Sequence, residues 1–306
     1  MAKGKNLHGK ISRIGQLIGG AFEIAVHEHI KAYLKIKHPE YEILLPLKGR
    51  KEITLEMLGG DARQVDSVIV QKDFVDPIAL LETKWLKDGR HWNDKGAWIL
   101  QLREVRKNYP TVRGIAAVLA GFWNHGVRIF LSNEGGVQMI LIATDDDIYN
   151  SIQPFLDEEL EEETFKLDAE NIRERFPEEH VENFYDFLNE FKKSGKLDKL
   201  AETWLNFKKI DDKGTTVKGK NLIEVSIDKI LMPIPKHPKI SNYEITLEIE
   251  TGNLIYRKFD DMEELLEFIN EYTGNPDKIY DDIKPKNKGR VGEQMSFYDT
   301  ETKDET

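Results

Sequence analysis

The chain has 306 residues, of which 40% are hydrophobic and 32% are charged, and its net charge of −11 argues against a protein that coats nucleic acid indiscriminately, because such affinity comes from Lys and Arg. Cysteine is absent, which excludes disulfides, thiolate metal sites and cysteine nucleophiles, so any bound metal must use oxygen or imidazole ligands. The sequence has no apolar run long enough to cross a bilayer and no signal-peptide pattern, so we expect a cytoplasmic protein with no membrane partner.

The first part of the chain is expected to form a helix followed by several strands. Apolar residues recur at three- and four-residue steps from residue 11 to about residue 34, which is typical of an amphipathic helix. Four extended runs follow, separated by short segments rich in glycine and charge. They predict three or four strands, at 41–47, 52–58, 64–70 and 77–85.

A second helix and further strands complete the part of the chain before residue 150. A helical pattern runs from about residue 92 to residue 108 and ends at a tyrosine–proline pair. A strongly apolar strand is predicted at 114–120, and strands at 127–131 and 137–143 are expected to complete the sheet. This order of elements predicts an α/β fold with a mixed sheet and helices packed on its faces, forming one domain over residues 1–150.

Residues 151–282 are expected to form a helical region followed by a small α+β region. The pattern from 153 to 210 is helical, and three later runs predict strands at 222–227, 243–250 and 254–259. The last two strands flank Thr251-Gly252-Asn253 and so predict a hairpin, with a helix following at 262–272. Residues 283–306 are rich in Lys, Gly, Asp, Glu and Thr, and we expect them to form a disordered tail.

The candidate chemistry lies where two carboxylates and one amine are expected to meet. Glu82 and Lys84 lie two positions apart in an apolar strand, so their side chains project to the same side. Asp66 lies in the preceding strand and can reach them if the two strands pair. Two converging carboxylates repel each other, and a hard divalent cation such as Mg²⁺ relieves that repulsion. Lys84 can then orient a metal-bound water and offset charge developing on phosphorus, so the set predicts phosphodiester hydrolysis.

Val65-Asp66, followed by Glu82-Thr83-Lys84 inside an apolar strand, resembles the signature of the PD-(D/E)xK nuclease superfamily, which has the restriction-endonuclease-like fold. The order of the expected helix, strands, helix and strand is also similar to that fold. The resemblance implies Mg²⁺ as the cofactor, with Asp66 and Glu82 as ligands. It further implies that the backbone carbonyl of Thr83 joins the metal and that Lys84 lies near the attacking water.

Many members of this superfamily, including Holliday-junction resolvases and some restriction enzymes, add a glutamate from the first helix, and Glu23 is the candidate here. It shares a helical line with Val26, Ile30 and Leu34, so it lies on or beside an apolar stripe where a charge would be costly without a partner. The alternative is that Glu23 lies at the edge of the stripe and faces solvent.

A loop of alternating basic and aromatic residues directly follows the proposed catalytic strand. Its Lys87, Arg90, His91 and Lys95 are candidates for holding DNA phosphates near the scissile bond. Arg63, three residues before the proposed aspartate, is a further candidate for a phosphate contact.

These features predict a Mg²⁺-dependent DNA endonuclease. The favoured form is a sequence-specific type II restriction endonuclease that cuts double-stranded DNA as a homodimer, with residues 151–282 contributing to recognition or dimerisation. The alternative is a structure-specific repair or recombination nuclease, supported by Glu23 and by residues 294–298, Gln-Met-Ser-Phe-Tyr, which resemble the short peptides that bind the sliding clamp. A third class, an inactive DNA-binding protein that kept the fold, is disfavoured because the whole acidic and lysine set is present.

Overall fold

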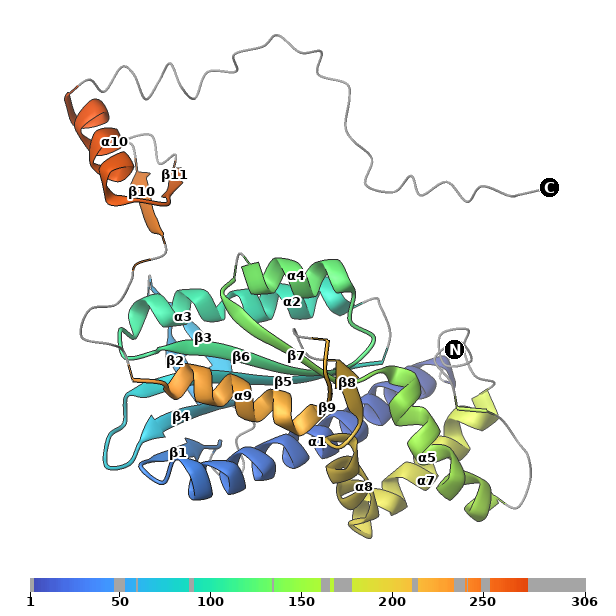
Figure 1. Cartoon of the computed structure of the whole chain (residues 1–306). Coiled ribbons are helices and arrows are strands. Elements are labelled where there is room, and N and C mark those ends of the chain that lie inside the picture. Colours follow the sequence, from blue (N-terminus) through green and yellow to red (C-terminus); the bar gives the residue numbers. More distant parts are fainter. Residues whose placement is uncertain are drawn as a thin grey trace, which may run out of the picture. The chain divides into compact units, whose positions relative to one another are not determined.

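Two compact units make up the chain in the computed structural model, Met1–Pro233 and Ile234–Thr306, and each is described by itself (Figure 1). The structure describes residues 3–46, 53–58, 60–87, 91–133, 135–160, 166–167, 178–210, 214–233, 240, 242–248 and 254–274. The first unit extends well beyond residue 150, where the sequence predicted a domain boundary.

A five-stranded mixed sheet, in the order β1-β4-β5-β6-β7, forms the centre of the first unit. Its strands are β1 (Tyr41–Leu44), β4 (Ser67–Gln71), β5 (Pro77–Leu86), β6 (Gly114–Gly121) and β7 (Val137–Ala143). The pairs β1–β4 and β4–β5 are antiparallel, whereas β6 runs parallel to β5 and β7 runs parallel to β6. The predicted α/β fold with a mixed sheet is therefore confirmed.

A separate hairpin of β2 (Ile53–Glu56) and β3 (Ala62–Val65) precedes β4 along the chain. The run 64–70, predicted as one strand, is divided at Asp66, because the chain leaves its partner β2 there and joins β1 and β5. Asp66 consequently lies at the junction between two sheets, not within a strand.

Helices cover both faces of the five-stranded sheet (Figure 1). One face carries α2 (Trp92–Leu100), α3 (Leu102–Asn108) and α4 (His125–Asn133). The other carries α1 (Lys3–Lys37), α5 (Asp145–Leu160), α7 (Glu178–Lys193), α8 (Lys196–Trp204) and α9 (Gly219–Leu231). A small hairpin of β8 (Lys208–Ile210) and β9 (Thr216–Lys218) lies between α8 and α9 along the chain. The one helix predicted for 92–108 is thus two helices, divided at Gln101.

Burial on both faces explains why the central strand β6 reads as an unbroken apolar run. All of its residues are buried. Ile115 and Leu119 belong to the core beneath α2, α3 and α4, whereas Ala116 and Val118 belong to the core on the α1 face. A parallel strand covered by helices on both sides has no solvent-facing residues, so it loses the alternation seen in half-buried strands.

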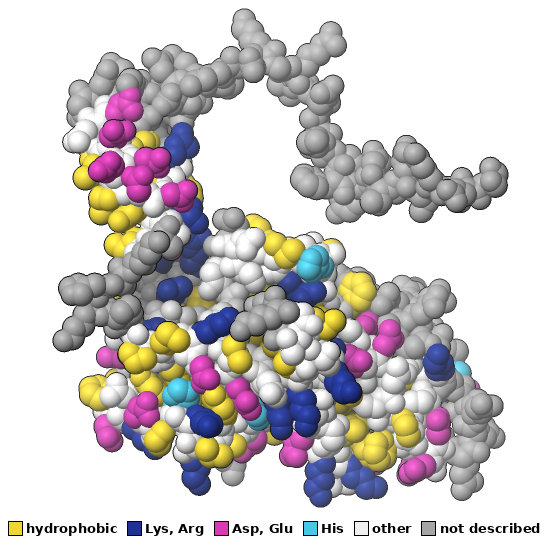
Figure 2. Space-filling view, viewed as in Figure 1, with side chains coloured by type: hydrophobic (Ala, Val, Ile, Leu, Met, Phe, Trp, Pro, Cys, Tyr) yellow, Lys and Arg dark blue, Asp and Glu magenta, His cyan; other side chains and the backbone are white. Residues whose placement is uncertain are grey.

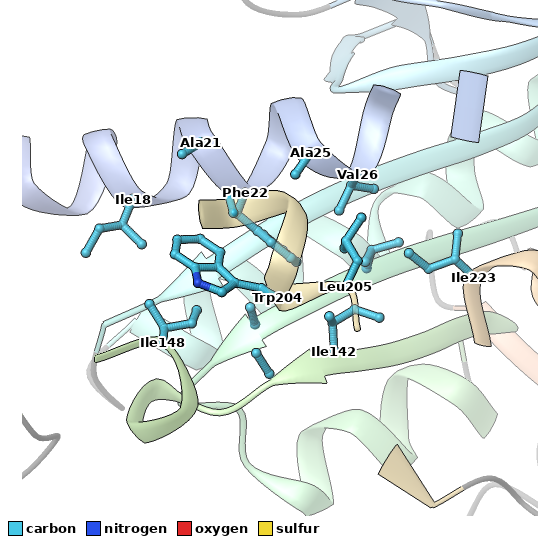
Figure 3. Packing of buried hydrophobic residues seen from close by; sticks show 14 of the residues in the cluster. Ile18, Ala21, Phe22, Ala25, Val26, Ile142, Ile148, Trp204, Leu205 and Ile223 are labelled. Atoms are coloured by element: carbon cyan, nitrogen blue, oxygen red, sulfur yellow. The ribbon is translucent and has the colours of Figure 1, made fainter. Parts of the chain in front are cut away.

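The core on the α1 face joins the later helices to the first helix (Figure 3). Trp204 of α8 is fully buried in the same cluster as Ile18 and Phe22 of α1. Its indole Nε1 donates a hydrogen bond of 2.8 Å to Oγ of Ser151 in α5. Because this core is shared, the helices after residue 150 belong to the first unit and do not form a domain of their own.

Two segments predicted as strands are helices in the structure. Residues 127–131 lie in α4, whose first turn is capped by the side-chain oxygen of Asn124. Residues 222–227 lie in α9, which buries Ile223 and Ile227 one helical turn apart against the sheet. A short apolar run does not distinguish a strand from a buried helix by periodicity, so packing decides between them.

The second unit contains the antiparallel strands β10 (Tyr243–Glu248) and β11 (Leu254–Phe259), followed by α10 (Met262–Gly274). The predicted pairing of these strands and the helix after them are confirmed, and Phe259 packs against Phe268 with ring centroids 5.1 Å apart. The predicted turn at 251–253 and the predicted tail at 283–306 lie outside the described residues. Among the helices that the structure describes, none has both the length and the apolar composition that a membrane span requires.

Candidate active site

Asp66 lies beside β5 at the point where the pairing between β4 and β5 ends. Ser67, the first residue of β4, is paired with Leu81. Beyond that pair, Oδ2 of Asp66 accepts a hydrogen bond of 2.8 Å from the backbone N–H of Thr83. The carboxylate thus replaces a backbone acceptor for a buried N–H group, and this contact fixes the side chain of Asp66 at the end of the ladder.

The three predicted catalytic side chains meet at this point. Nζ of Lys84 donates to both oxygens of Asp66, at 2.9 Å to Oδ1 and 2.7 Å to Oδ2. It also lies 2.7 Å from Oε2 of Glu82. Glu82 and Asp66 are 1% and 5% exposed, and Lys84 is the most exposed member of the set. One ammonium group therefore joins two buried carboxylates, and the structure brings together the residues that strand periodicity placed on one side.

Arg63, which was predicted to contact a DNA phosphate, adds a second buried cation to the site. Residues of β3 alternate between exposed and buried, and Arg63 is on the buried side, 5% exposed. Its Nη2 lies 3.0 Å from Oε1 of Glu82, and its guanidinium lies over Trp98, 4.6 Å from the ring centroid. A cation enclosed in this way cannot reach a DNA backbone without leaving its carboxylate, so Arg63 belongs to the interior of the site.

Burial controls the protonation of Glu82. Loss of hydration is the main cause that raises the pKa of its carboxyl from the ordinary value of 4.5 to about 8, and the negative charge of Asp66 adds to it. The positive charges of Lys84 and Arg63 oppose this rise without cancelling it. For Lys84, burial disfavours the ammonium, but the two carboxylates outweigh burial and hold its pKa above the usual range. Burial thus favours the protonated form of Glu82, while Lys84 remains protonated at neutral pH.

His27 of α1 is a neighbour of the site that was not among the predicted residues. Its side chain is 5% exposed, and its Nε2 has no hydrogen-bond partner among the described residues. Burial lowers the pKa of the imidazole to about 4, although the negative charge of Asp66 opposes this and Lys84 reinforces it. His27 is therefore neutral at physiological pH. Its position next to Val26, inside the apolar stripe of the first helix, was the signal present in the sequence.

Glu23 lies one turn before His27 on α1, and its side chain is partly buried. This helix packs against β5, where a Cβ atom added to Gly15 would lie 3.7 Å from the ring of Trp85. The helix that carries Glu23 therefore lies against the strand that carries the candidate site. The predicted role of Glu23 in catalysis stays a prediction.

The remaining candidates for DNA contacts lie around the beginning of α2. Lys87 directly follows β5 and is partly exposed. His91, directly before α2, is exposed, and Lys95 lies in the first part of this helix with Nζ 5.3 Å from the ring centroid of Trp98. Arg90 lies outside the described residues. Contacts between these side chains and DNA stay predictions.

The oxygen donors of the site suit a hard divalent cation. In the described part of the chain, no three His, Asp or Glu side chains are grouped so that they could hold a metal ion by themselves. Two carboxylates nevertheless converge on one cationic atom, since Nζ of Lys84 lies 2.7 Å from both Asp66 Oδ2 and Glu82 Oε2. Mg²⁺ is usually bound by one or two carboxylates together with waters and substrate phosphates, so this pair fits it. Thr83 contacts Asp66 through its N–H, and ligation by its carbonyl stays a prediction.

A scan against protein-family models, a search of curated proteins and a search of solved structures each found no match to the chain. Any functional assignment therefore depends on the residues themselves, their geometry and the order of the elements. The buried carboxylate pair and its shared lysine are the most specific of these features.

Proposed function

We propose that the chain is a Mg²⁺-dependent nuclease of the PD-(D/E)xK superfamily that hydrolyses phosphodiester bonds in DNA. The observation that carries this proposal is the contact between Lys84 and two buried carboxylates, those of Asp66 and Glu82. Two carboxylates that converge on one cationic atom suit a divalent cation, and a protonated amine beside them suits a reaction that develops negative charge on phosphorus.

The order of the elements supports the same assignment. The long helix α1 comes first, strands β1, β4 and β5 follow, and then α2, α3 and β6. Asp66 directly precedes β4, and the triplet Glu82-Thr83-Lys84 lies in β5. The restriction-endonuclease-like fold implied by the resemblance has a helix, three strands with the acid and the triplet on the second and third, another helix and a further strand. In this comparison the hairpin of β2 and β3 is an insertion before Asp66.

In the proposed reaction Asp66 and Glu82 hold Mg²⁺, which when bound supplies a water of lowered pKa and polarises the scissile phosphate. Lys84 acts as a hydrogen-bond donor and not as a base, because its pKa lies above the usual range and its amine stays protonated. Its N–H groups are therefore available to a phosphate oxygen or to the attacking water, where they offset developing negative charge. Glu82 gives up its proton when a cation is beside it, because positive charge favours the ionised carboxylate.

The favoured form of this nuclease is a sequence-specific type II restriction endonuclease that acts on double-stranded DNA as a homodimer. The second unit then contributes to recognition or dimerisation. Figure 2 shows acidic side chains gathered on this unit, where α10 exposes Glu263, Glu264 and Glu267. Because carboxylates repel phosphates, the strand β11 with its exposed Arg257 and Lys258 is the part suited to face DNA.

A structure-specific repair or recombination nuclease is the second candidate. It is favoured by Glu23, which lies partly buried one turn from His27 on the helix packed against β5. Residues 294–298, which resemble sliding-clamp peptides, lie outside the described residues, so a clamp partner stays a prediction.

Cleavage assays test the proposal and separate the two candidates. The protein is incubated with Mg²⁺ and a plasmid of known sequence, and separately with branched and mismatched duplexes. Discrete, reproducible plasmid fragments support restriction, and cutting confined to junctions or mismatches supports repair. Failure of the wild-type protein to cut any of these substrates in Mg²⁺ would refute the function.

Variants test the site itself. Glu82→Ala and Lys84→Ala are expected to abolish cleavage while leaving DNA binding largely intact, because both side chains act on the reacting phosphate and not on the rest of the duplex. Lys107→Ala is the matched control, since Lys107 is an exposed lysine of α3 paired with Glu104. It should cleave as the wild type does. Full activity in either of the first two variants would remove the proposed residues from the chemistry.

A further inference from the structure

Arg63 is a buried cation whose contacts hold it in one place. A guanidinium that is 5% exposed would be strongly destabilising without partners. Its Nη2 donates to Oε1 of Glu82 at 3.0 Å and to the backbone carbonyl of Trp98 at 3.2 Å. Its Nη1 donates to the backbone carbonyl of Gln64, and the Trp98 ring covers the guanidinium. Contacts with β3, α2 and β5 therefore fix its position.

The two carboxylate oxygens of Glu82 have different partners. Oε1 bonds to Arg63, whereas Oε2 lies beside Nζ of Lys84, which also bonds to Asp66. Because backbone carbonyls on two other residues restrain the guanidinium, Arg63 cannot follow the carboxylate if that side chain turns. The contact therefore determines which oxygen of Glu82 is directed toward Asp66.

Lys84 does not supply this orientation by itself. Its side chain is 20% exposed, and its ammonium is shared between Glu82 and both oxygens of Asp66. A lysine carries a point charge on a flexible stem, whereas the planar arginine fork restrains the direction of its partner. In the proposed reaction the ammonium is also needed at the phosphate, and only Arg63 then remains on Glu82.

We propose that Arg63 is a positioning residue that orients Glu82 toward the divalent cation, and that it makes no contact with DNA. This inference rests on the proposed nuclease function. Lys95 provides the contrast, because its Nζ contacts the same Trp98 ring at 5.3 Å but its side chain is partly exposed on α2. The Trp98 ring thus contacts two cations. The buried Arg63 restrains the carboxylate of Glu82, whereas the partly exposed Lys95 can be reached by a phosphate.

The test separates turnover from DNA affinity. Arg63→Met removes the guanidinium, and Arg63→Lys keeps the charge but cannot bond to Glu82 and to the Trp98 carbonyl together. The value of kcat is measured in Mg²⁺ at saturating duplex, and Kd is measured on the same duplex without divalent cation. We expect Arg63→Met to lower kcat by about 100-fold, as for a catalytic group misplaced by about 1 Å, and to leave Kd unchanged. Arg63→Lys should recover part of the lost kcat.

Two further variants serve as comparisons. Lys95→Met should raise Kd and reduce its dependence on salt, which is the behaviour of a phosphate contact. Arg106→Met replaces an exposed arginine of α3 and should match the wild type in both quantities. A raised Kd with wild-type kcat in Arg63→Met would overturn the inference, as would wild-type values of both.

Thermal unfolding shows whether each variant is folded. If Arg63→Met is not folded, the kcat and Kd of Arg63→Lys are compared with those of the wild type in the same way. If the wild type cleaves no substrate, the proposed function fails, and calorimetric binding of Mn²⁺ alone then tests the inference separately. Weaker Mn²⁺ binding by Arg63→Lys than by the wild type would support it, and equal binding or none by either protein would overturn it.

Discussion

The stability of the metal-free protein should fall as the pH rises from about 6.5 to about 8.5, and Glu82 is the reason. Its carboxyl has a pKa of about 8 in the folded chain against an ordinary value of 4.5, so the folded chain retains a proton that the unfolded chain has lost. Stability from such a group is fully present below the ordinary pKa and is lost as the pH rises through the raised pKa. For these two values, the free energy of unfolding falls by about 2 kcal/mol over the interval.

Chemical denaturation of the wild type and of Glu82→Gln at both ends of this interval measures the effect. Glutamine does not titrate, so the difference between the two proteins separates the contribution of Glu82 from that of His27. In thermal unfolding, about 2 kcal/mol corresponds to roughly 4–8 °C in Tm for a folding unit of the size of Met1–Pro233. If the free energy of unfolding changed with pH equally in the two proteins, this would refute the reasoning that burial and Asp66 raise the pKa of Glu82.

Acidification and the substitution Gly121→Ala should also lower the stability of the protein. The first acts through His27, whose effect on stability has the opposite pH dependence to that of Glu82, and the second acts through a steric overlap. The pKa of His27 is lowered to about 4, so its contribution to stability is present above the ordinary value of 6.5 and is lost on acidification. The loss should approach about 3 kcal/mol near pH 4 and be absent from denaturation curves of His27→Gln; an equal loss in that variant would contradict this cause. Gly121→Ala should destabilise by on the order of 3 kcal/mol, because φ is +88° and the added Cβ would overlap the carbonyl oxygen of Leu86. A Tm equal to that of the wild type would refute the steric reason.

The pairing of Glu82 with Lys84 was predictable because strand periodicity is a local property. Two residues two positions apart in a buried strand share a side whatever surrounds them. The contact with Asp66 was predictable as well, because consecutive apolar runs joined by a short turn usually pair. The position of Asp66 between two sheets was not predictable, because the change of strand partner at this residue depends on the hairpin that precedes it.

The surroundings of the site could not be predicted because they are set by contacts between distant segments. β3 has only 4 residues, so its sequence pattern does not show which side of the strand is buried. The burial of Arg63 follows from its packing under Trp98, which is a contact with a distant segment. His27 is near Asp66 only because α1 packs against β5. The first unit extends past residue 150 for the same reason, since Trp204 packs into the core of the first helix.

In the proposed active site, Asp66 and Glu82 share one divalent cation with Lys84 beside it. Crystals grown with Mn²⁺ and a DNA duplex, measured at the manganese absorption edge, test this directly. We expect an anomalous peak between the two carboxylates, with Lys84 turned away from Glu82 and toward a phosphate oxygen. Absence of the peak at saturating Mn²⁺, with Lys84 still in contact with both carboxylates, would contradict this arrangement.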